Sequence, residues 1–512
     1  MKIALKEMPT DIAELQKLVL ANEVTLHKAE QREAKLLQQI HTLLEALRLE
    51  KHRSFGASSE KAPGQSELFD EADVPPLDLP EEVDGVEPQL ETPASRQGAR
   101  KPLPADLPRI RRVIELSDDE RRCACGCEMI EIGEEISEQV DIIPAQVQVI
   151  QQVRKKYACK ACEETVKVAP KATVLLPKAI ASGNTMAYII TSKYADGLPL
   201  YRLSGILKRY GIDLPRQTLS ESVLKVASKL TPLIDTMQAQ LLAGDVLHMD
   251  ETRVQVLNEP DKSAQSQSYM WVQRGGPPDK PVIHFTYDPS RGAAVPDRLL
   301  ANYSGALVTD GYAAYRSMLA DKPIDHLCCW AHVRRKFVDA QKAQPKGKTG
   351  KADMAVNFIA KLYAVEKQSK DSDADQRTIH RQQYSVSTLE KLHAWLLKTQ
   401  QQVPPKSAIG KAVNYALNYW TELSRYTENG NWPIDNNLAE NAIRPFVIGR
   451  KAWLFSNSQR GATASANLYS LIETAKANHR EPYQYLSWLF ERLPTADLDD
   501  CEALMPWNAP QV

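Results

Sequence analysis

The segment VLHMDETRVQVL, residues 246–257, has apolar side chains in a period-two pattern that predicts a β-strand. Two further segments of the same kind follow, YMWVQR (269–274) and PVIHFTYD (281–288). Each is bounded by Gly, Pro or Asp, the residues that end strands and form turns. Three such strands in succession predict an antiparallel meander.

The segment after the meander alternates between helix and strand. A helix-like stretch (293–302) precedes the short apolar strand GALVTD (305–310), and a further helix precedes the strand HLCCW (326–330). Strand, strand, strand, helix, strand, helix, strand is the order of a ribonuclease-H-like domain. We therefore expect an α/β multidomain chain with a ribonuclease-H-like catalytic domain over 244–475, interrupted by a helical insertion over 331–430.

Three carboxylates fall on corresponding elements of this domain. Asp250 lies in the middle of the first strand, Asp310 at the end of the fourth, and Glu440 on a helix that begins within IDNNLAENAIRP (434–445). In a ribonuclease-H-like sheet the first and fourth strands are neighbours, so we expect these side chains to converge. Converging carboxylates repel one another unless cations lie between them, and hard cations with oxygen ligands fit best. The sequence therefore predicts a site for two Mg²⁺ ions, for which Mn²⁺ can substitute, and phosphoryl transfer as its chemistry. Fallback ligands are Glu251 and Asp435.

Each carboxylate also has an ordinary structural interpretation. Asp250 could end an exposed strand, Asp310 could belong to a turn, and Glu440 could lie on a solvated helix. Their joint occurrence in the expected order on the expected elements favours the catalytic interpretation.

Residues 10–50 are predicted to be one long helix, in a domain over 1–55. Its apolar residues repeat as a heptad seam, which is interrupted by Asn22 and Glu33. Such a pattern predicts a coiled coil resembling a leucine zipper, and hence a homo-oligomer that is at least a dimer, although a helix folded against its own chain is the alternative. The seam consists of Ile12, Leu15, Val19, Leu26, Ala29, Leu36, Ile40, Leu43 and Leu47.

Charge is segregated along the chain, so the net charge of -1 conceals its distribution. Residues 60–95 contain eleven acidic side chains against Lys61 alone, and six prolines. This composition predicts an acidic disordered linker over 56–108. The rest of the chain then carries about +9, a moderate excess that points towards a polyanion.

Five of the eight cysteines lie within forty positions, in CACGCEM (123–129) and YACKAC (157–162). Two cysteine clusters about thirty residues apart predict one structural Zn²⁺ in a domain over 109–175, because each cluster can supply two thiolates to a tetrahedral site. Four of the five would bind the ion, and the first cluster leaves open which two it contributes. The candidates are Cys123, Cys125, Cys127, Cys159 and Cys162.

A helical region is predicted over 176–243. Within it, YRLSGILKRYGIDLPRQTLSESVLKVA (201–227) has the form of helix, Gly-containing turn and Pro-started helix. A helix-turn-helix of this form often lays its second helix on DNA, and a plain helical hairpin is the alternative. The candidate contacts are Arg209, Arg216 and Gln217.

Two further stretches are rich in basic residues. The insertion begins with Arg334 and Arg335, and residues 441–472 contain no acidic residue. Basic side chains neutralise phosphates, and Trp453 and Phe455 could stack on unpaired bases. The candidate contacts in the second stretch are Arg444, Arg450, Lys451 and Arg460.

Several motifs resemble those of one family, the transposases of bacterial insertion-sequence family 66, which belong to the DDE group. They are HMDET, VTDGYAAY, CCWAHVRRKF and DNNLAENAIRPFVIGRKAWLFSNSQRGA, with SFGASSEK near the N-terminus and EALMPWN in the C-terminal helical tail (476–512). The resemblance covers nearly the whole chain. It implies that Asp250, Asp310 and Glu440 are the DDE triad, that DNA is the substrate, and that accessory proteins of the same element take part.

The chain is thus expected to bind transposon ends and to catalyse metal-dependent DNA cleavage and strand transfer. A non-catalytic DNA-binding repressor or scaffold is the alternative, and a nuclease acting on RNA hybrids is a weaker one. No run of apolar residues is long enough to span a membrane and the N-terminus lacks the apolar core of a signal peptide, so we expect a cytoplasmic, nucleoid-associated protein.

Overall fold

The computed structural model describes most of the chain in two compact units, one of residues 1–87 with 156–512 and one of residues 88–155. In the second unit the described residues form no helix or strand. Among the described residues no helix is both long and apolar enough to cross a membrane. The described residues are 11–55, 109–111, 113, 139, 146–158, 166–344, 350–497 and 499–510.

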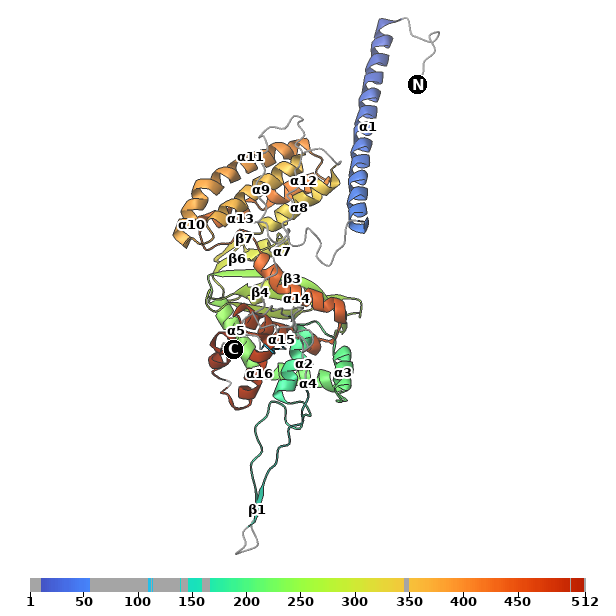
Figure 1. Cartoon of the computed structure of the whole chain (residues 1–512). Helices are drawn as coiled ribbons and strands as arrows, with labels where there is room; N and C mark the ends of the chain where they lie inside the picture. Colours follow the sequence, from blue (N-terminus) through green and yellow to red (C-terminus); the bar gives the residue numbers. More distant parts are fainter. Residues whose placement is uncertain are drawn as a thin grey trace, which may run out of the picture. The chain divides into compact units, whose positions relative to one another are not determined.

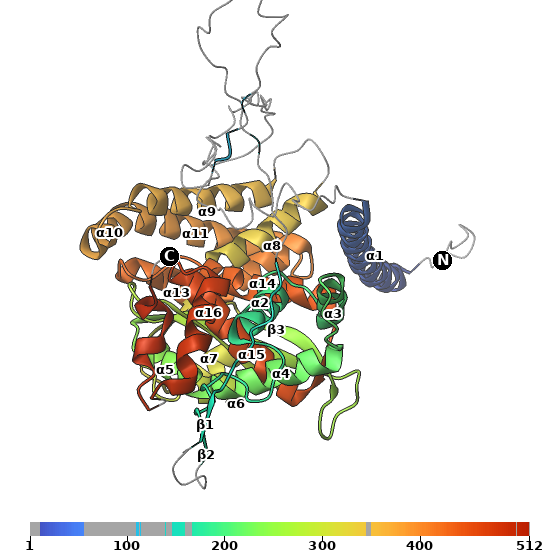
Figure 2. The ribbon, with the colours of Figure 1, turned by 60° about the horizontal axis from the view of Figure 1, so that its bottom comes forward.

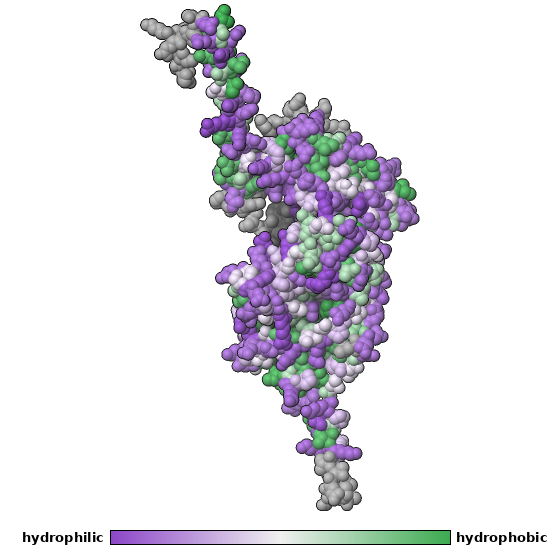
Figure 3. All heavy atoms as spheres, turned by 180° about the vertical axis from the view of Figure 1, so that it is seen from behind, coloured by the Kyte–Doolittle hydropathy of each residue, from purple (hydrophilic) through white to green (hydrophobic). Residues whose placement is uncertain are grey.

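Helix α1 (Ile12–Phe55) is continuous over the heptad region, which contains neither Pro nor Gly. Its seam residues are exposed; Leu26, for example, is 62% and Leu43 70% accessible. Figure 3 shows apolar side chains interspersed with hydrophilic ones along this helix. An exposed apolar seam is what a coiled-coil helix presents before it meets a partner, so self-association stays a prediction.

The core of the first unit is a mixed sheet with the strand order β5-β4-β3-β6-β7. The first three strands in sequence form the predicted antiparallel meander, while β3 pairs in parallel with β6, and β6 in parallel with β7. A mixed α/β architecture is therefore confirmed. The strands are β3 (Val246–Asn258), β4 (Gln267–Gly275), β5 (Val282–Asp288), β6 (Gly305–Thr309) and β7 (Ile324–Cys328), and short helices α6 (Ala294–Leu299) and α7 (Ala313–Leu319) flank β6.

Strand β3 lies in the centre of the sheet, between β4 and β6. Leu247, His248 and Met249 are all buried, because both faces of the sheet are covered there, and burial becomes partial at Asp250. Asp250 thus lies where β3 passes from the buried core to a partly exposed part of the sheet.

Helix α15 protects the edge strand β5. The backbone N–H groups of Ile283 and Phe285 donate to the hydroxyls of Thr474 and Ser470 at 2.9 and 2.7 Å. These side chains replace a missing strand partner and satisfy an edge that would otherwise be open to aggregation. The helices and strand after the insertion are α14 (Asn437–Trp453), β8 (Ser456–Ser458), which pairs with β3, then α15 (Gln459–Ala477) and α16 (Pro482–Arg492), followed by 3₁₀ turns up to Asn508.

A second apolar core forms between β6, β7 and the helices that follow β7. Its largest fully buried side chains include Trp330 and Phe337 of α8. Figures 1 and 2 show this group of helices on the β7 side of the sheet, with α2, α4, α15 and α16 on the other side. The group comprises α8 (Trp330–Ala343), α9 (Lys351–Gln368), α10 (Ala374–His380), a π-helical turn (Arg381–Ser385), α11 (Val386–Gln402), α12 (Ala408–Asn418), α13 (Trp420–Ser424) and a 3₁₀ turn (Arg425–Glu428).

The region before the sheet is helical, as its sequence predicts. The turn between α3 and α4 contains Gly211 with φ of +85°, and Pro215 caps the second helix, so the predicted helix, Gly turn and Pro-started helix are present. The elements are a short hairpin of β1 (Lys156–Ala158) and β2 (Val166–Val168), then α2 (Gly183–Tyr194), α3 (Leu200–Arg209), α4 (Arg216–Lys229) and α5 (Thr231–Leu242).

Candidate active site

Asp250 is the most strongly perturbed carboxylate of the sheet. Burial raises its pKa well above the usual value, and the negative charges of Glu251, Asp310 and Glu440 raise it further. Its Oδ1 accepts a hydrogen bond from the backbone N–H of Glu251 at 2.8 Å, which opposes the rise in pKa only partly. Asp250 therefore lies in a common electrostatic environment with carboxylates from two distant parts of the chain.

Asp310 follows β6 directly, beside Asp250 on the neighbouring strand. Burial raises its pKa, while a hydrogen bond from the N–H of Tyr312 (3.0 Å) and the charges of Arg291 and Lys336 lower it. The following Gly311 donates its N–H to the hydroxyl of Tyr415 on α12 at 3.0 Å.

A side chain at position 311 would require Tyr415 to move. A Cβ at this position would lie 2.5 Å from the Tyr415 hydroxyl oxygen, too close for any contact between such atoms. The tyrosine can approach only a glycine so closely. The helices after β7 thereby fix the loop that carries Asp310.

Glu440 lies in the first turn of α14 and its side chain is 9% exposed. Burial raises its pKa, Arg335 on α8 lowers it, and the charges of Asp435 and Asp310 raise it. Arg335 donates from Nη2 to Oε2 of Glu440. The carboxylate is thus held by a cation from α8.

His332 lies on the other side of the Glu440 carboxylate, with Nδ1 3.4 Å from Oε1. Burial, together with the charges of Arg335 and Lys336, lowers the pKa of His332 to about 3. The imidazole is therefore neutral at physiological pH, and its approach to Glu440 is a polar contact instead of an ion pair.

Asn436 sets the position at which α14 begins. Its side chain, fully buried, accepts from His248 Nδ1 at 3.0 Å and donates to the carbonyl of Met249 at 2.9 Å. Its backbone N–H donates to Sγ of Cys329, just before α8, at 3.1 Å. Asn436 thus joins β3, the start of α8 and the start of α14, and it places Glu440 one helical turn away from the strand that carries Asp250.

The two fallback carboxylates both have other partners. Glu251 accepts from Tyr315 at 2.8 Å and pairs with Arg291 at 2.6 Å, with only 2% of its side chain exposed. Asp435 accepts from Tyr363 of α9 at 2.9 Å and from the N–H of Asn437 at 3.1 Å. Both contribute to the negative field, and both are engaged in holding neighbouring elements.

The donor set of the three central carboxylates suits a hard cation. Among the described residues, neither Oδ2 of Asp250 nor Oδ2 of Asp310 accepts a hydrogen bond, and Oε1 of Glu440 is buried without a hydrogen-bond partner. A buried carboxylate oxygen without a hydrogen-bond partner, such as Oε1 of Glu440, is costly unless it binds a cation. A Mg²⁺ or Mn²⁺ ion fits this oxygen-rich environment.

A second combination of potential ligands shares Glu440. Ligand atoms of Cys329, His332 and Glu440 lie within 4.8 Å of one another. Cys329 is fully buried, its pKa is raised well above the usual value by burial, and Sγ already accepts the N–H of Asn436. The thiol is therefore best explained as part of the Asn436 junction.

The residues predicted to contact DNA differ in their exposure to solvent. Arg334 is only 7% exposed, so its assignment as a DNA contact stays a prediction that its burial does not favour. Arg335 faces Glu440, and Arg444 is half-buried. Arg450 donates to Thr252 Oγ1, two residues beyond Asp250 on β3, at 3.2 Å. The exposed candidates are Arg209, Arg216, Gln217, Lys451 and Arg460.

The predicted zinc ligands lie outside the described residues. These are Cys123, Cys125, Cys127, Cys159 and Cys162.

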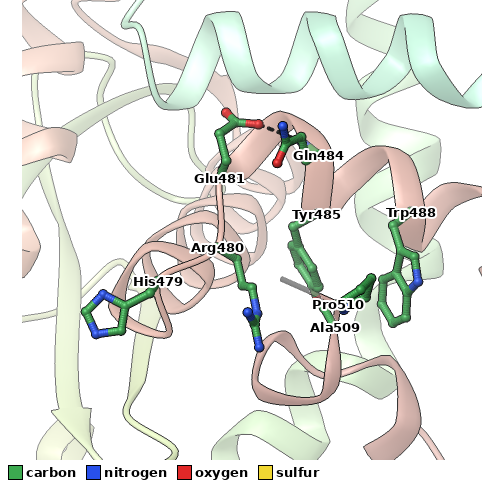
Figure 4. Close-up of a pocket in the computed structure, with 8 residues that line it drawn as sticks. All are labelled: His479, Arg480, Glu481, Gln484, Tyr485, Trp488, Ala509 and Pro510. Atoms are coloured by element: carbon green, nitrogen blue, oxygen red, sulfur yellow. Dashed lines mark hydrogen bonds between the residues drawn. The ribbon is translucent and has the colours of Figure 1, made fainter. Parts of the chain in front are cut away.

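The C-terminal region contains a hollow of about 300 Å³ between α16 and the final turns, lined by His479, Arg480, Glu481 and Tyr485 among others (Figure 4). Glu481 caps α16 by accepting the N–H of Gln484 at 2.7 Å. None of the three central carboxylates lines this hollow, so we do not assign the chemistry to it.

Sequence reasoning did not identify His332, Lys336 or Tyr415 as parts of the site. His332 and Lys336 are both in the motif CCWAHVRRKF. Their spacing of four residues places the two side chains on the same face of a helix. Tyr415 gave no signal, because nothing in its own segment indicates a contact with residue 311.

Comparisons with known proteins show the family to which the chain belongs. The model described as "Transposase IS66 family" matches residues 178–464, the "IS66 C-terminal element" matches 470–507, the "zinc-finger binding domain of transposase IS66" matches 120–163, and "Transposase C of IS166 homeodomain" matches 42–112. The first match spans more than half of the chain.

Relatives of similar length occur in Sinorhizobium fredii (strain NBRC 101917 / NGR234). "Uncharacterized protein y4jD" is 33% identical over 424 residues, which cover 79% of this chain and 81% of that protein. "Uncharacterized protein y4qI" is 31% identical over 448 residues, which cover 84% and 82%. From the family models and these relatives together, we conclude that the chain belongs to the IS66 family of transposases.

Proposed function

We propose that this transposase binds the ends of its element and catalyses metal-dependent cleavage of the DNA strand and its transfer to target DNA, on a ribonuclease-H-like domain. The strand order β5-β4-β3-β6-β7, with a meander followed by two parallel strands, supports the ribonuclease-H-like assignment. Asp250, Asp310 and Glu440 are its proposed catalytic residues.

The observation that carries the proposal is the convergence of these three carboxylates around Asp250. They come from the middle of β3, the end of β6 and the first turn of α14, and each has a raised pKa to which burial contributes most. The charges of Asp310 and Glu440 also raise the pKa of Asp250. A fold that brings acidic groups together against their repulsion is typical of a functional site.

The chain's own residues would hold two Mg²⁺ ions, or Mn²⁺, through the oxygens of Asp250, Asp310 and Glu440. Ions bound there would stabilise the attacking and leaving oxygens of a phosphodiester during hydrolysis and transesterification. Arg335 and Lys336 supply positive charge on the α8 side, which lowers the pKa values of Glu440 and Asp310 respectively and opposes the effect of burial. Neutral His332 places a polar ring nitrogen 3.4 Å from Oε1 of Glu440.

The remaining parts of the proposal concern DNA and assembly. Exposed basic residues on α3, α4, α14 and α15 would bind phosphates. The cysteine region would hold one Zn²⁺, and α1 would join at least two chains. Accessory proteins of the same element would assist, as the family resemblance implies.

The proposal is tested by incubating labelled DNA that carries an end of the element with the full chain and Mg²⁺. We expect a nick at the end of the element, and no nick with Asp250→Ala, Asp310→Ala or Glu440→Ala, each of which should bind the end within a few-fold of wild type. Glu440→Gln should be at most partly rescued by Mn²⁺, because a neutral amide is a poor ligand for a hard cation. End binding without cleavage by the wild type would favour the non-catalytic scaffold.

A further inference from the structure

The chain makes an unusual corner where α14 ends. Leu454 has φ of +66° and ψ of -51°, and the N–H of Phe455 donates to the carbonyl of Trp453 at 2.9 Å. This i to i+2 hydrogen bond around a residue with positive φ and negative ψ defines a γ-turn of the rare, strained kind. A non-Gly residue with positive φ is uncommon, and for a bulky one it is an outlier.

The strain at this corner is not offset by burial of its side chains. Leu454 is 65% and Phe455 43% exposed, whereas Trp453 is half-buried and packs edge-to-face on Phe446 at 5.5 Å. Of the two aromatic residues that the sequence offers for stacking, Phe455 is therefore the more exposed. Strained residues that the packing does not require occur mainly at functional sites.

Both sides of the corner are anchored. The N–H of Leu454 donates to the carbonyl of Arg450 at 2.7 Å, and Ser456 pairs with Val256 of β3. Leu454 and Phe455 are consequently presented as a rigid apolar pair that loses little conformational entropy when it binds.

The corner shares strand β3 with the carboxylates. Val256 lies six residues beyond Asp250, which corresponds to about 20 Å along an extended strand. Arg450 contacts Thr252 between these two points. DNA bound with its reactive phosphate at Asp250 would therefore reach the corner after about six base pairs, at roughly 3.4 Å each.

Exposed basic residues flank the corner. Lys451 and Arg460 are exposed on either side of it, and Arg253 is exposed on β3. Residues 441–472 contain no acidic side chain. An exposed apolar pair with basic neighbours is complementary to nucleic acid, whose bases are apolar on their faces and whose backbone is anionic.

We propose that Leu454 and Phe455 form a wedge that enters between adjacent bases of the transposon-end DNA and unstacks them, about six base pairs from the phosphate at the catalytic carboxylates. Apolar side chains inserted between base steps kink a duplex, and a kink would bend the DNA along β3. The inference rests on the proposed function, because it requires DNA at Asp250. The wedge would contact the faces of the bases, whereas the basic residues would contact the phosphates.

The test uses element-end duplexes with 2-aminopurine at successive single positions, since this base fluoresces more strongly when it is unstacked. The full chain is added in Ca²⁺, so that the readout does not depend on cleavage, and DNA binding is measured in parallel by anisotropy. We expect a fluorescence rise that peaks within a few base pairs of the sixth position from the cleaved phosphate. Phe455→Ala and Leu454→Ala should lose most of this rise, and Phe455→Ala should bind about tenfold more weakly, as expected for loss of one base-stacking contact.

Two further variants separate the wedge from a structural role. Leu454→Gly suits the positive φ, so it should fold with unchanged or raised Tm and still lose the rise. Ile379→Ala removes another exposed apolar side chain, 66% accessible and located on α10, and should behave as wild type. A uniform fluorescence at all positions, or a full rise with Leu454→Gly and Phe455→Ala, would overturn the wedge even if the wild type cleaves normally. Absence of cleavage in Mg²⁺ with the rise intact would instead count against the proposed catalysis alone.

Discussion

Arg335 donates a hydrogen bond to the carboxylate of Glu440, although 105 positions of sequence separate the two residues. The contact joins the first helix after β7 to the helix that returns to β3. It neutralises the third proposed catalytic carboxylate and fixes its orientation. Arg335 is therefore a positioning residue in our interpretation, and its earlier assignment as a DNA contact becomes the alternative.

Arg335→Gln should lower the cleavage rate at neutral pH by about 10- to 100-fold, as is typical for residues that orient metal ligands. Arg335 lowers the pKa of Glu440, so its removal should raise that pKa and move the acidic limb of the pH–rate profile to higher pH. Arg335→Lys keeps the charge, so its cleavage rate should lie between those of the wild type and Arg335→Gln. An unchanged profile together with a reduced salt dependence of DNA binding would return Arg335 to the phosphate contacts.

Asp250→Asn should stabilise the metal-free protein at pH 7 to 8, with a rise in Tm of about 2–4 °C for each kcal/mol of repulsion removed. The folded-state pKa of Asp250 is raised, so the stability associated with its protonation is present at low pH and lost as the pH rises through that pKa. The difference between variant and wild type should accordingly shrink as the pH falls.

In Mg²⁺ the wild type should have a higher Tm than Asp250→Asn. The ion stabilises the wild type by binding to its native state and should have little effect on the variant. Thermal denaturation in EDTA and in Mg²⁺ measures both effects, and the buried histidines contribute equally to the two proteins. A wild type that is insensitive to Mg²⁺ would contradict the assigned metal site.

Asn436→Ala should destabilise the fold by roughly 1–3 kcal/mol, since it leaves His248 and the Met249 carbonyl unpaired in the core. Because the start of α14 would then be less firmly positioned, cleavage should fall more than end binding. Asn441→Ala, at an exposed position of the same helix, is the matched control and should preserve both stability and cleavage. Denaturant titration and single-turnover cleavage test this pair.

The cysteine region should hold one Zn²⁺ per chain, with Cys159 and Cys162 among its ligands. Metal analysis of freshly prepared, unchelated protein measures the stoichiometry. Single substitutions of Cys123, Cys125 and Cys127 by Ser should leave one of the three variants with full zinc content. Finding no zinc in this protein would contradict the predicted zinc site.

Helix α1 should make the protein at least a dimer. Leu26→Glu places a charge in the heptad seam and should lower the mass measured by analytical ultracentrifugation, as should deletion of residues 1–50. Leu20→Glu, at an exposed position outside the seam, should leave the mass unchanged. A wild-type chain that sediments as a monomer would contradict the prediction.

Much of the architecture is present in local sequence patterns. The alternation in 246–257 and in the two segments after it predicts three strands because side chains of a strand alternate between faces, and the structure has these strands as an antiparallel meander. The Gly turn and Pro-started helix of 201–227 are equally local, and the structure contains both. The acidic residues at 250, 310 and 440 could be selected because each lies at a recognisable place on its element.

The contacts that hold the candidate site could not be selected in this way. Arg334 and Arg335 are neighbours with the same charge, yet the first is buried and the second faces Glu440, since successive positions on a helix point in different directions. Nothing in the segment around Tyr415 indicates its contact with Gly311, and nothing near Leu454 predicts a positive φ.

The sequence by itself determined the strands, the helices and the acidic residues, because periodicity and residue type act within a few positions of the chain. The tertiary structure alone decided which cation meets which carboxylate, which arginine is buried, and where a strained corner is left exposed. These outcomes depend on how α8, α12 and α14 pack against β3 and β6, and packing depends on shape and burial across more than a hundred residues.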